Sequence, residues 1–134
     1  MTDEIGAVLR EVKTIALVGA SARPDRPSHE VMAFLQSRGY RVIPVNPGLA
    51  GQTLLGERVF ASLGEIDAPI DMVDVFRRPE TVAPIAEAAI AVGARVLWLQ
   101  LGVVNEDAAA RARAAGLKVV MDRCPKIEWL RRHG

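Results

Sequence analysis

The sequence predicts an α/β fold of three layers, with a doubly wound, mostly parallel sheet of five strands and helices on both faces. Two observations predict it. Short apolar runs rich in β-branched residues alternate with helical stretches along the chain. The connections between them are of modest length, and right-handed crossovers of that kind place helices on both faces of a parallel sheet. Because the 134 residues contain no repeat or linker, we expect a single Rossmann-like domain over residues 1–134.

The first half of the chain supplies two of the predicted strands. Apolar residues at helical spacing predict an opening helix over residues 3–12, and the apolar run 14–18 predicts a strand. After a turn at Gly19, Ser28 is the expected N-cap of a helix that ends at Gly39. The elements expected next are a strand (40–45), a glycine-rich loop (48–56), a short extended piece (58–60) and a turn of helix from Ser62.

The second half supplies the other three strands. The third main strand is expected over residues 70–76, and Pro79 is the expected first residue of a helix that ends at Gly93. The remaining expected elements are a strand (95–100), a helix capped by Asn105 and ended by Gly116, a strand (117–121) and a terminal helix from Pro125.

Composition excludes several classes of function. A net charge of +1 gives no field that would attract nucleic acid or a membrane surface, and 4% aromatic residues offer few stacking platforms for bases. We find no secretory leader and no apolar stretch long enough to span a bilayer. The single cysteine, Cys124, excludes an internal disulfide and suits a reducing compartment. We therefore expect a cytoplasmic protein with a small-molecule ligand, and leave a protein partner open.

The turn after the first strand is a candidate phosphate site, because parallel sheets bind ligands at the carboxyl ends of their strands. Gly19 allows a tight turn, the amides that follow can face a phosphate, and Ser21 adds a hydroxyl donor. Ala20 lies between them. The full G-x-G-x-x-G pattern is absent, so a ligand-free connection is the alternative.

Four arginines follow the first and third strands. Arg23 and Arg26 lie between the phosphate turn and the next helix, where they can clamp a phosphate bidentately. Arg77 and Arg78 follow Phe76 and precede a helix whose N-terminal dipole disfavours positive charge, a conflict that an anionic ligand would relieve. Solvated loop charges are the alternative for Arg23 and Arg26.

The second strand ends in Asn46 and Pro47, where an NAD-binding fold normally carries an acidic residue for the ribose diol. The missing carboxylate counts against NAD. A ligand with a phosphorylated ribose remains possible, and Pro47 offers an apolar surface on which adenine can rest.

The sequence shows no catalytic or metal-binding constellation. His29 and His133 lack the partners that a metal site needs, and Ser21 has no assignable base. Asp71 and Asp74 face different sides of a strand and make no evident acid–base pair. We therefore predict no catalytic and no metal-binding residues.

Seven strings of the chain, taken together and in order, carry a family resemblance. They are residues 18–21, 26–28, 39–40, 45–47, 73–77, 98–103 and 120–124. On these strings the chain resembles the CoA-binding protein family that is similar to the N-terminal CoA-binding domain of the succinyl-CoA synthetase alpha subunit. The resemblance implies that coenzyme A (CoA) phosphates lie at the turn of residues 19–21. It implies that Val45 and Pro47, with residues 76–78, line the nucleotide cleft, and that Gln100 and Gly102 lie near the pantetheine or thiol end.

Two departures limit what the resemblance implies. The synthetase subunit has a second domain with a phosphorylated histidine, which we do not expect in this chain. The lysine that the synthetase carries after its second strand is also missing, since Leu49 and Ala50 stand there. CoA binding is therefore expected to carry over, and the ligase reaction is not.

Three hypotheses follow. The first is a binder of CoA or acyl-CoA without catalysis of its own. The second is an NAD(P)-linked oxidoreductase, or an acyl-CoA-using enzyme completed by a partner chain. The third is a CoA-responsive regulatory module, with Cys124 forming a mixed disulfide with CoA. The roles of Asp122, Arg123 and Cys124 stay open, and a structural role for this cluster is the simplest.

Overall fold

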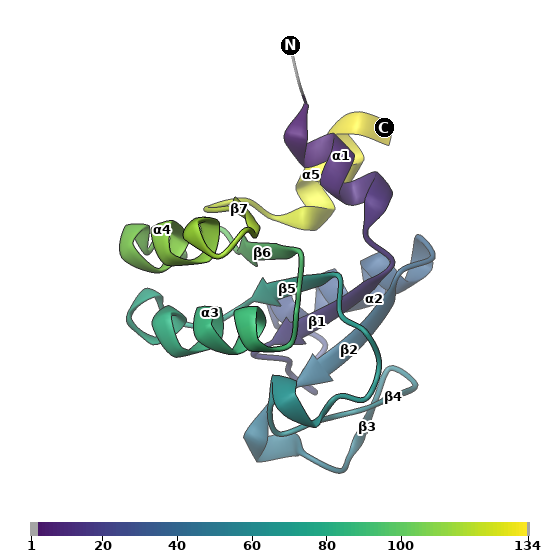
Figure 1. The fold of residues 1–134 in the computed structure, drawn as a ribbon. Coiled ribbons are helices and arrows are strands. Elements are labelled where there is room, and N and C mark those ends of the chain that lie inside the picture. The colour runs from purple at the N-terminus through teal and green to yellow at the C-terminus, as the bar shows by residue number, and fades with distance from the viewer. Residues whose placement is uncertain (1–2, 134) are drawn as a thin grey trace.

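The computed structural model describes residues 3–133 and contains a five-stranded parallel sheet in the order β2-β1-β5-β6-β7 (Figure 1). Its strands are β1 (Thr14–Val18), β2 (Arg41–Val45), β5 (Met72–Val75), β6 (Val96–Leu99) and β7 (Lys118–Val120). Every pair of neighbours in this sheet is parallel. The predicted fold class, a doubly wound α/β sheet, is confirmed.

Helices cover both faces of the sheet and enclose two separate cores. One face carries α1 (Glu4–Glu11), α2 (Pro27–Ser37) and α5 (Pro125–His133), and the other carries α3 (Val82–Ala91) and α4 (Glu106–Ala114). Side chains alternate between the faces along each strand. Leu17 and Trp98 therefore pack in the core beneath α1, α2 and α5, whereas Leu97 packs beneath α3 and α4.

The segment between β2 and β5 is short and irregular. It contains a two-stranded antiparallel hairpin of β3 (Thr53–Leu54) and β4 (Glu57–Arg58), within and just after the predicted glycine-rich loop. Two single-turn 3₁₀ helices, Pro47–Leu49 and Leu63–Glu65, flank this hairpin. The segment lies along β2, because Phe60 forms a parallel bridge with Val45.

Two predicted helix starts were wrong. Ser28 does not cap α2, because the helix begins one residue earlier at Pro27, with Arg26 in the cap position. Proline is favoured at the first helical position because its fixed φ suits the helix and it has no N–H to leave unpaired. Pro79 begins a 3₁₀ turn (Pro79–Thr81), and α3 follows it only from Val82.

The strand order places a topological switch point between β1 and β5. From β1 the chain moves to β2 on one side, and it then crosses to β5, β6 and β7 on the other. The loops that leave β1 and β5 therefore part in opposite directions at the carboxyl edge of the sheet. Such a parting opens a crevice, and doubly wound folds bind their ligands there.

Candidate ligand cleft at the carboxyl ends of the strands

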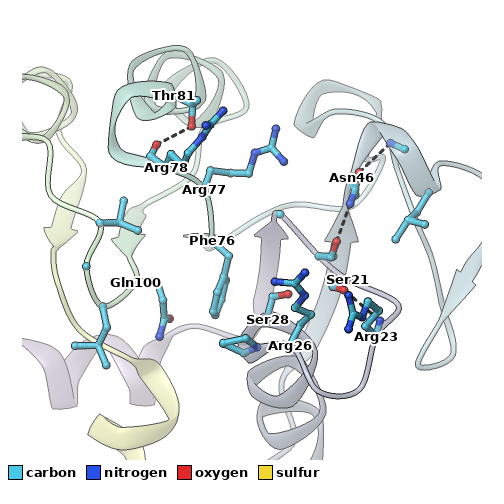
Figure 2. A pocket seen from close by; sticks show the side chains of 18 of the residues that line it. Ser21, Arg23, Arg26, Ser28, Asn46, Phe76, Arg77, Arg78, Thr81 and Gln100 are labelled. Carbon is cyan, nitrogen blue, oxygen red and sulfur yellow. Dashed lines mark hydrogen bonds between the residues drawn. The ribbon is translucent and has the colours of Figure 1, made fainter.

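A cleft of about 940 Å³ lies at this switch point (Figure 2). Its volume is in the range of sites for small molecules and cofactors. The cleft is lined by residues of four loops, those that follow β1, β2, β5 and β6, and by the first turn of α2. These loops are far apart in the sequence and meet only because the strands are parallel.

The structure brings most of the predicted ligand residues to this one cleft. The predicted residues that line it are Gly19, Ala20, Ser21, Arg23, Arg26, Asn46, Phe76, Arg77, Arg78, Gln100 and Gly102. The other two, Val45 and Pro47, line a smaller and more apolar hollow of about 260 Å³. The two cavities adjoin, because Gly19, Arg77 and Thr81 line both.

The phosphate turn offers fewer amides than the sequence suggested. The N–H groups of Gly19 and Ala20 both donate to the Val45 carbonyl oxygen, at N···O distances of 3.0 and 3.3 Å. The N–H groups of Ser21 and Ala22 have no acceptor among residues 3–133. The Ser21 Oγ accepts the Arg23 N–H at 3.1 Å, which leaves its hydroxyl hydrogen free to donate. The donors available to an anion therefore begin at Ser21.

The four arginines of the cleft differ in whether they are already paired. Arg23 lies 3.1 Å from Asp25, and Arg78 lies 3.6 Å from Glu80, both in exposed ion pairs. Within residues 3–133, Arg26 and Arg77 have no carboxylate within ion-pair distance. Figure 2 shows these two unpaired arginines on opposite sides of the opening. They are the cations best placed to receive an anionic ligand.

The N-terminus of α2 adds backbone donors to the same side of the cleft. Arg26 makes no capping hydrogen bond through its side chain, and Pro27 has no N–H. The N–H groups of Ser28 and His29 therefore have no acceptor in the part of the chain that the structure describes. Open amides at a helix N-terminus, together with the helix dipole, favour a phosphate.

Asn46 ties two loops of the cleft together. Its Nδ2 donates to the Ala20 carbonyl oxygen at 2.8 Å, and its Oδ1 accepts the Gly48 N–H at 2.8 Å. This side chain therefore fixes the loop after β2 against the phosphate turn. A carboxylate at this position could not donate to Ala20, which is a physical reason for asparagine at the end of β2.

The far end of the cleft is formed by the loop after β6, which the loop after β7 holds in place. The Gly102 N–H donates to the Asp122 carboxylate at 2.8 Å, and Asp122 itself adopts a φ of +59°. Gln100 is 8% exposed, and its Oε1 is buried without a hydrogen-bond partner within the described residues. A buried unpartnered acceptor beside a cleft is uncommon in a folded protein.

The cluster after β7 is structural in character. The Arg123 carbonyl oxygen accepts the Trp98 indole N–H at 2.8 Å, and Asp122 holds the neighbouring loop. Cys124 is 6% exposed and packs in the core beneath α1, α2 and α5. A thiol so enclosed is poorly placed for exchange with a disulfide in solution.

Several residues of the site were missed from the sequence. Ser28 and Thr81 line the cleft, and both carried a signal, because each lies in the first turn after a proline at a strand-to-helix connection. Asp74 does not line the cleft, but it lies in β5 with both carboxylate oxygens buried and without a hydrogen-bond partner among residues 3–133. Burial raises the pKa of Asp74 well above its ordinary value. The sequence feature that could have identified Asp74 is an acidic residue in an otherwise apolar strand.

Comparison with known proteins identifies close relatives. The uncharacterized protein YneT of Bacillus subtilis (strain 168) is 46% identical over 124 residues, which cover 92% of this chain and 90% of the relative. The structure of cell-free ID.343 from Thermus thermophilus is 40% identical, with a TM-score of 0.93 and 98% of each chain covered. A similar fold also forms 26% of the dinucleotide-forming acetyl-coenzyme A synthetase 1 of Ca. Korarchaeum cryptofilum, at a TM-score of 0.70 and 20% identity over 82% of this chain.

The family model described as "CoA binding domain" matches residues 13–129, from the start of β1 to within α5. The match includes every loop that lines the cleft. The chain belongs to this family of CoA-binding domains.

Proposed function

We propose that the protein binds CoA or an acyl-CoA in the cleft between β1 and β5, without catalysis of its own, and that residues 1–134 act as one binding domain. The observation that carries the proposal is that Arg26 and Arg77, which form no ion pair within residues 3–133, lie on opposite sides of the cleft. CoA carries a pyrophosphate and a ribose 3′-phosphate. Two separated cations and the open amides near Ser21 and Ser28 suit a ligand with more than one phosphate.

The smaller hollow completes this proposal. Val45, Pro47 and Leu63 give it an apolar lining, and it adjoins the cleft through Gly19 and Arg77. A flat apolar ring such as adenine fits this chemistry, with its ribose phosphate directed toward Arg77. Gln100 and Gly102 lie on the opposite side of the switch point, on the β6 loop. We assign that end of the cleft to the pantetheine arm.

The alternatives have less support. An NAD-linked enzyme would need a ribose partner at the end of β2, where both ends of the Asn46 amide are already hydrogen-bonded to Ala20 and Gly48. A mixed disulfide between CoA and Cys124 would need an accessible thiol, and that side chain is buried. No helix within residues 3–133 is both long and apolar enough to cross a membrane.

Thermal unfolding with matched ligands tests the proposal. CoA is expected to raise the melting temperature, and NAD at the same concentration is not. A ligand present at one hundred times its Kd stabilises the fold by about 2.7 kcal/mol. No stabilisation by CoA would contradict CoA binding, and equal stabilisation by NAD would contradict the proposed preference for CoA.

Dephospho-CoA tests the role of the ribose 3′-phosphate. A hydrogen bond to a charged group contributes about 1.5–3 kcal/mol, so loss of this phosphate is expected to weaken binding roughly tenfold or more. Isothermal titration calorimetry with both ligands measures the ratio. Indistinguishable affinities would show that no arginine binds that phosphate.

A further inference from the structure

Three buried acceptor oxygens lie together beneath the cleft without a donor. They are both carboxylate oxygens of Asp74 and the Oε1 of Gln100, and within residues 3–133 no other buried side-chain oxygen or nitrogen lacks a hydrogen-bond partner. Burying such an oxygen costs free energy unless a donor forms a hydrogen bond to it. Their grouping therefore suggests that Asp74 and Gln100 belong to one hydrogen-bonding arrangement.

The sheet register places these side chains on one face and close to each other. Asp74 pairs with Trp98 across β5 and β6, so their side chains face the same way. Gln100 lies two residues beyond Trp98 and faces that side as well, and its N–H bonds to the Val75 carbonyl oxygen at 3.2 Å. Asp74 and Gln100 are thus diagonal neighbours on adjacent strands, within reach of a long side chain.

A proton on Asp74 would supply the missing donor. Asp74 is fully buried between Leu17 and Trp98, both of which are also fully buried, and it has no cationic partner within the described residues. Burial of this kind raises the pKa of the carboxyl group and so favours its neutral form. A neutral carboxylic acid carries one O–H donor.

The two ends of the Gln100 amide then have different roles. Its Oε1 is directed inward, where it is buried, whereas its Nε2 makes no hydrogen bond within the described residues and belongs to a side chain that lines the cleft. A donor that holds Oε1 inward fixes the amide with its N–H groups toward the cleft.

We propose that Asp74 is a positioning residue whose carboxyl O–H, directly or through one buried water, binds Gln100 Oε1 and so presents Gln100 Nε2 to a ligand carbonyl. The inference rests on the proposed function, because the carbonyl would be an amide of the pantetheine arm or the thioester of an acyl-CoA. Asp74 itself does not line the cleft and acts only through Gln100.

Substitutions at Asp74 separate this role from a purely structural one. Asp74→Asn keeps a donor of the same shape and is expected to bind CoA within about twofold of the wild type. Asp74→Leu removes the donor and is expected to weaken CoA binding by about three- to tenfold, the value of one neutral hydrogen bond. Adenosine 3′,5′-bisphosphate lacks the pantetheine arm, so its affinity should be the same for all three proteins.

A double-mutant cycle tests whether Asp74 acts through Gln100. Gln100→Met should weaken CoA binding as Asp74→Leu does, and the double variant should be no weaker than Gln100→Met alone. Wild-type CoA affinity in Asp74→Leu, an equal loss in Asp74→Asn, or an equal loss for the bisphosphate would each overturn the assignment. If the wild type bound no CoA, the proposed function itself would fail.

Infrared spectroscopy gives a test that does not depend on the leucine variant folding. The difference spectrum of wild type minus Asp74→Asn at neutral pH should show the carbonyl band of a protonated carboxylic acid. A carboxylate band in its place would overturn the proposal, whatever the ligand affinities.

Discussion

Gly19 occupies a position from which both backbone and packing exclude a side chain. Its φ is +93°, and a Cβ there would lie 2.3 Å from the Phe76 carbonyl oxygen and 3.0 Å from Arg77 Cδ. From the sequence we expected this glycine to allow a tight turn whose following amides face a phosphate. The structure shows another reason for it, since the loops after β1 and β5 touch at this point and hold the cleft in shape.

Gly19→Ala is therefore expected to be more destabilising than its backbone conformation alone requires. Gly39 has a nearly equal φ of +94°, and a Cβ there would meet nothing within 4 Å, so Gly39→Ala is the matched control. The left-handed conformation costs an alanine roughly 1–2 kcal/mol at either site. The clash at Gly19 should add about 1–3 kcal/mol. Urea unfolding measures the free energy of unfolding of both variants. An equal loss of stability in the two would show that the loops move apart and relieve the clash at Gly19.

Residue types were easier to predict than residue roles. The sequence indicated Asn46 because an acid was missing there, but its hydrogen bond to Ala20, in the loop after β1, is a long-range contact that spacing cannot supply. Asp74 shows the same limit. Alternation predicted that Asp74 and Asp71 face different sides of the strand, whereas the lack of a partner for Asp74 within residues 3–133 depends on what the other strands and α2 place around it.

At the scale of elements, α1 and α5 join the two ends of the chain. They lie side by side in Figure 1. Asp3, the N-cap of α1, accepts two hydrogen bonds from Arg132 of α5, both at 2.8 Å. Arg132 also binds the buried carboxylate of Glu128 at 3.0 Å. These contacts lower the pKa of Asp3 from 3.8 to about 2, chiefly through the Arg132 hydrogen bond and then the Gly6 N–H.

The lowered pKa of Asp3 predicts a specific pH dependence. A carboxyl group with a depressed pKa stabilises the fold above its unfolded pKa, and this stabilisation is lost as pH falls through the folded value. Asn is also a good N-cap, so Asp3→Asn removes the charge and keeps the cap. The variant should be less stable than the wild type at neutral pH, and the difference should shrink between about pH 4 and pH 2.

Urea unfolding across that pH range measures the difference. Asp67→Asn is the control, because Asp67 is exposed and forms no ion pair within residues 3–133. A difference that does not change with pH would mean that the Asp3 carboxylate contributes no charge-dependent stability.

Element boundaries followed from local chemistry wherever a side chain or glycine decides them. Asn105 caps α4 by accepting the Ala108 N–H, as predicted, and Gly93 and Gly116 end their helices with positive φ. The start of α2 was misplaced because two local signals compete there. Proline at the first helical position prevailed over the serine that follows it.

At the scale of the whole molecule, the strand order could not be predicted from the sequence. Alternation of strands and helices fixes a parallel sheet, but it does not say on which side of β1 the third main strand inserts. That choice decides which loops meet. It places the loop after β5 beside the loop after β1, and so Arg77 opposite Arg26.

The arginine pair gives a prediction for the cleft as a whole. Because Arg26 and Arg77 come from opposite sides, each should contact a different part of an anionic ligand, and Arg26→Ala or Arg77→Ala should each weaken CoA binding roughly tenfold or more. Arg23 and Arg78 are already paired with carboxylates, so their alanine variants should lose less affinity for CoA.

Arg113→Ala is the matched control for this series, because Arg113 is an exposed arginine of α4 that does not line the cleft. It removes the same charge from the protein without touching the site. Calorimetric titration at low and high salt separates long-range attraction by net charge from direct contact with the ligand. Salt screens the long-range attraction strongly and close contacts less. If Arg113→Ala lost as much affinity as the two cleft variants, net charge alone would explain binding. If both cleft variants kept wild-type affinity while CoA still bound, the ligand would have to lie elsewhere on the molecule.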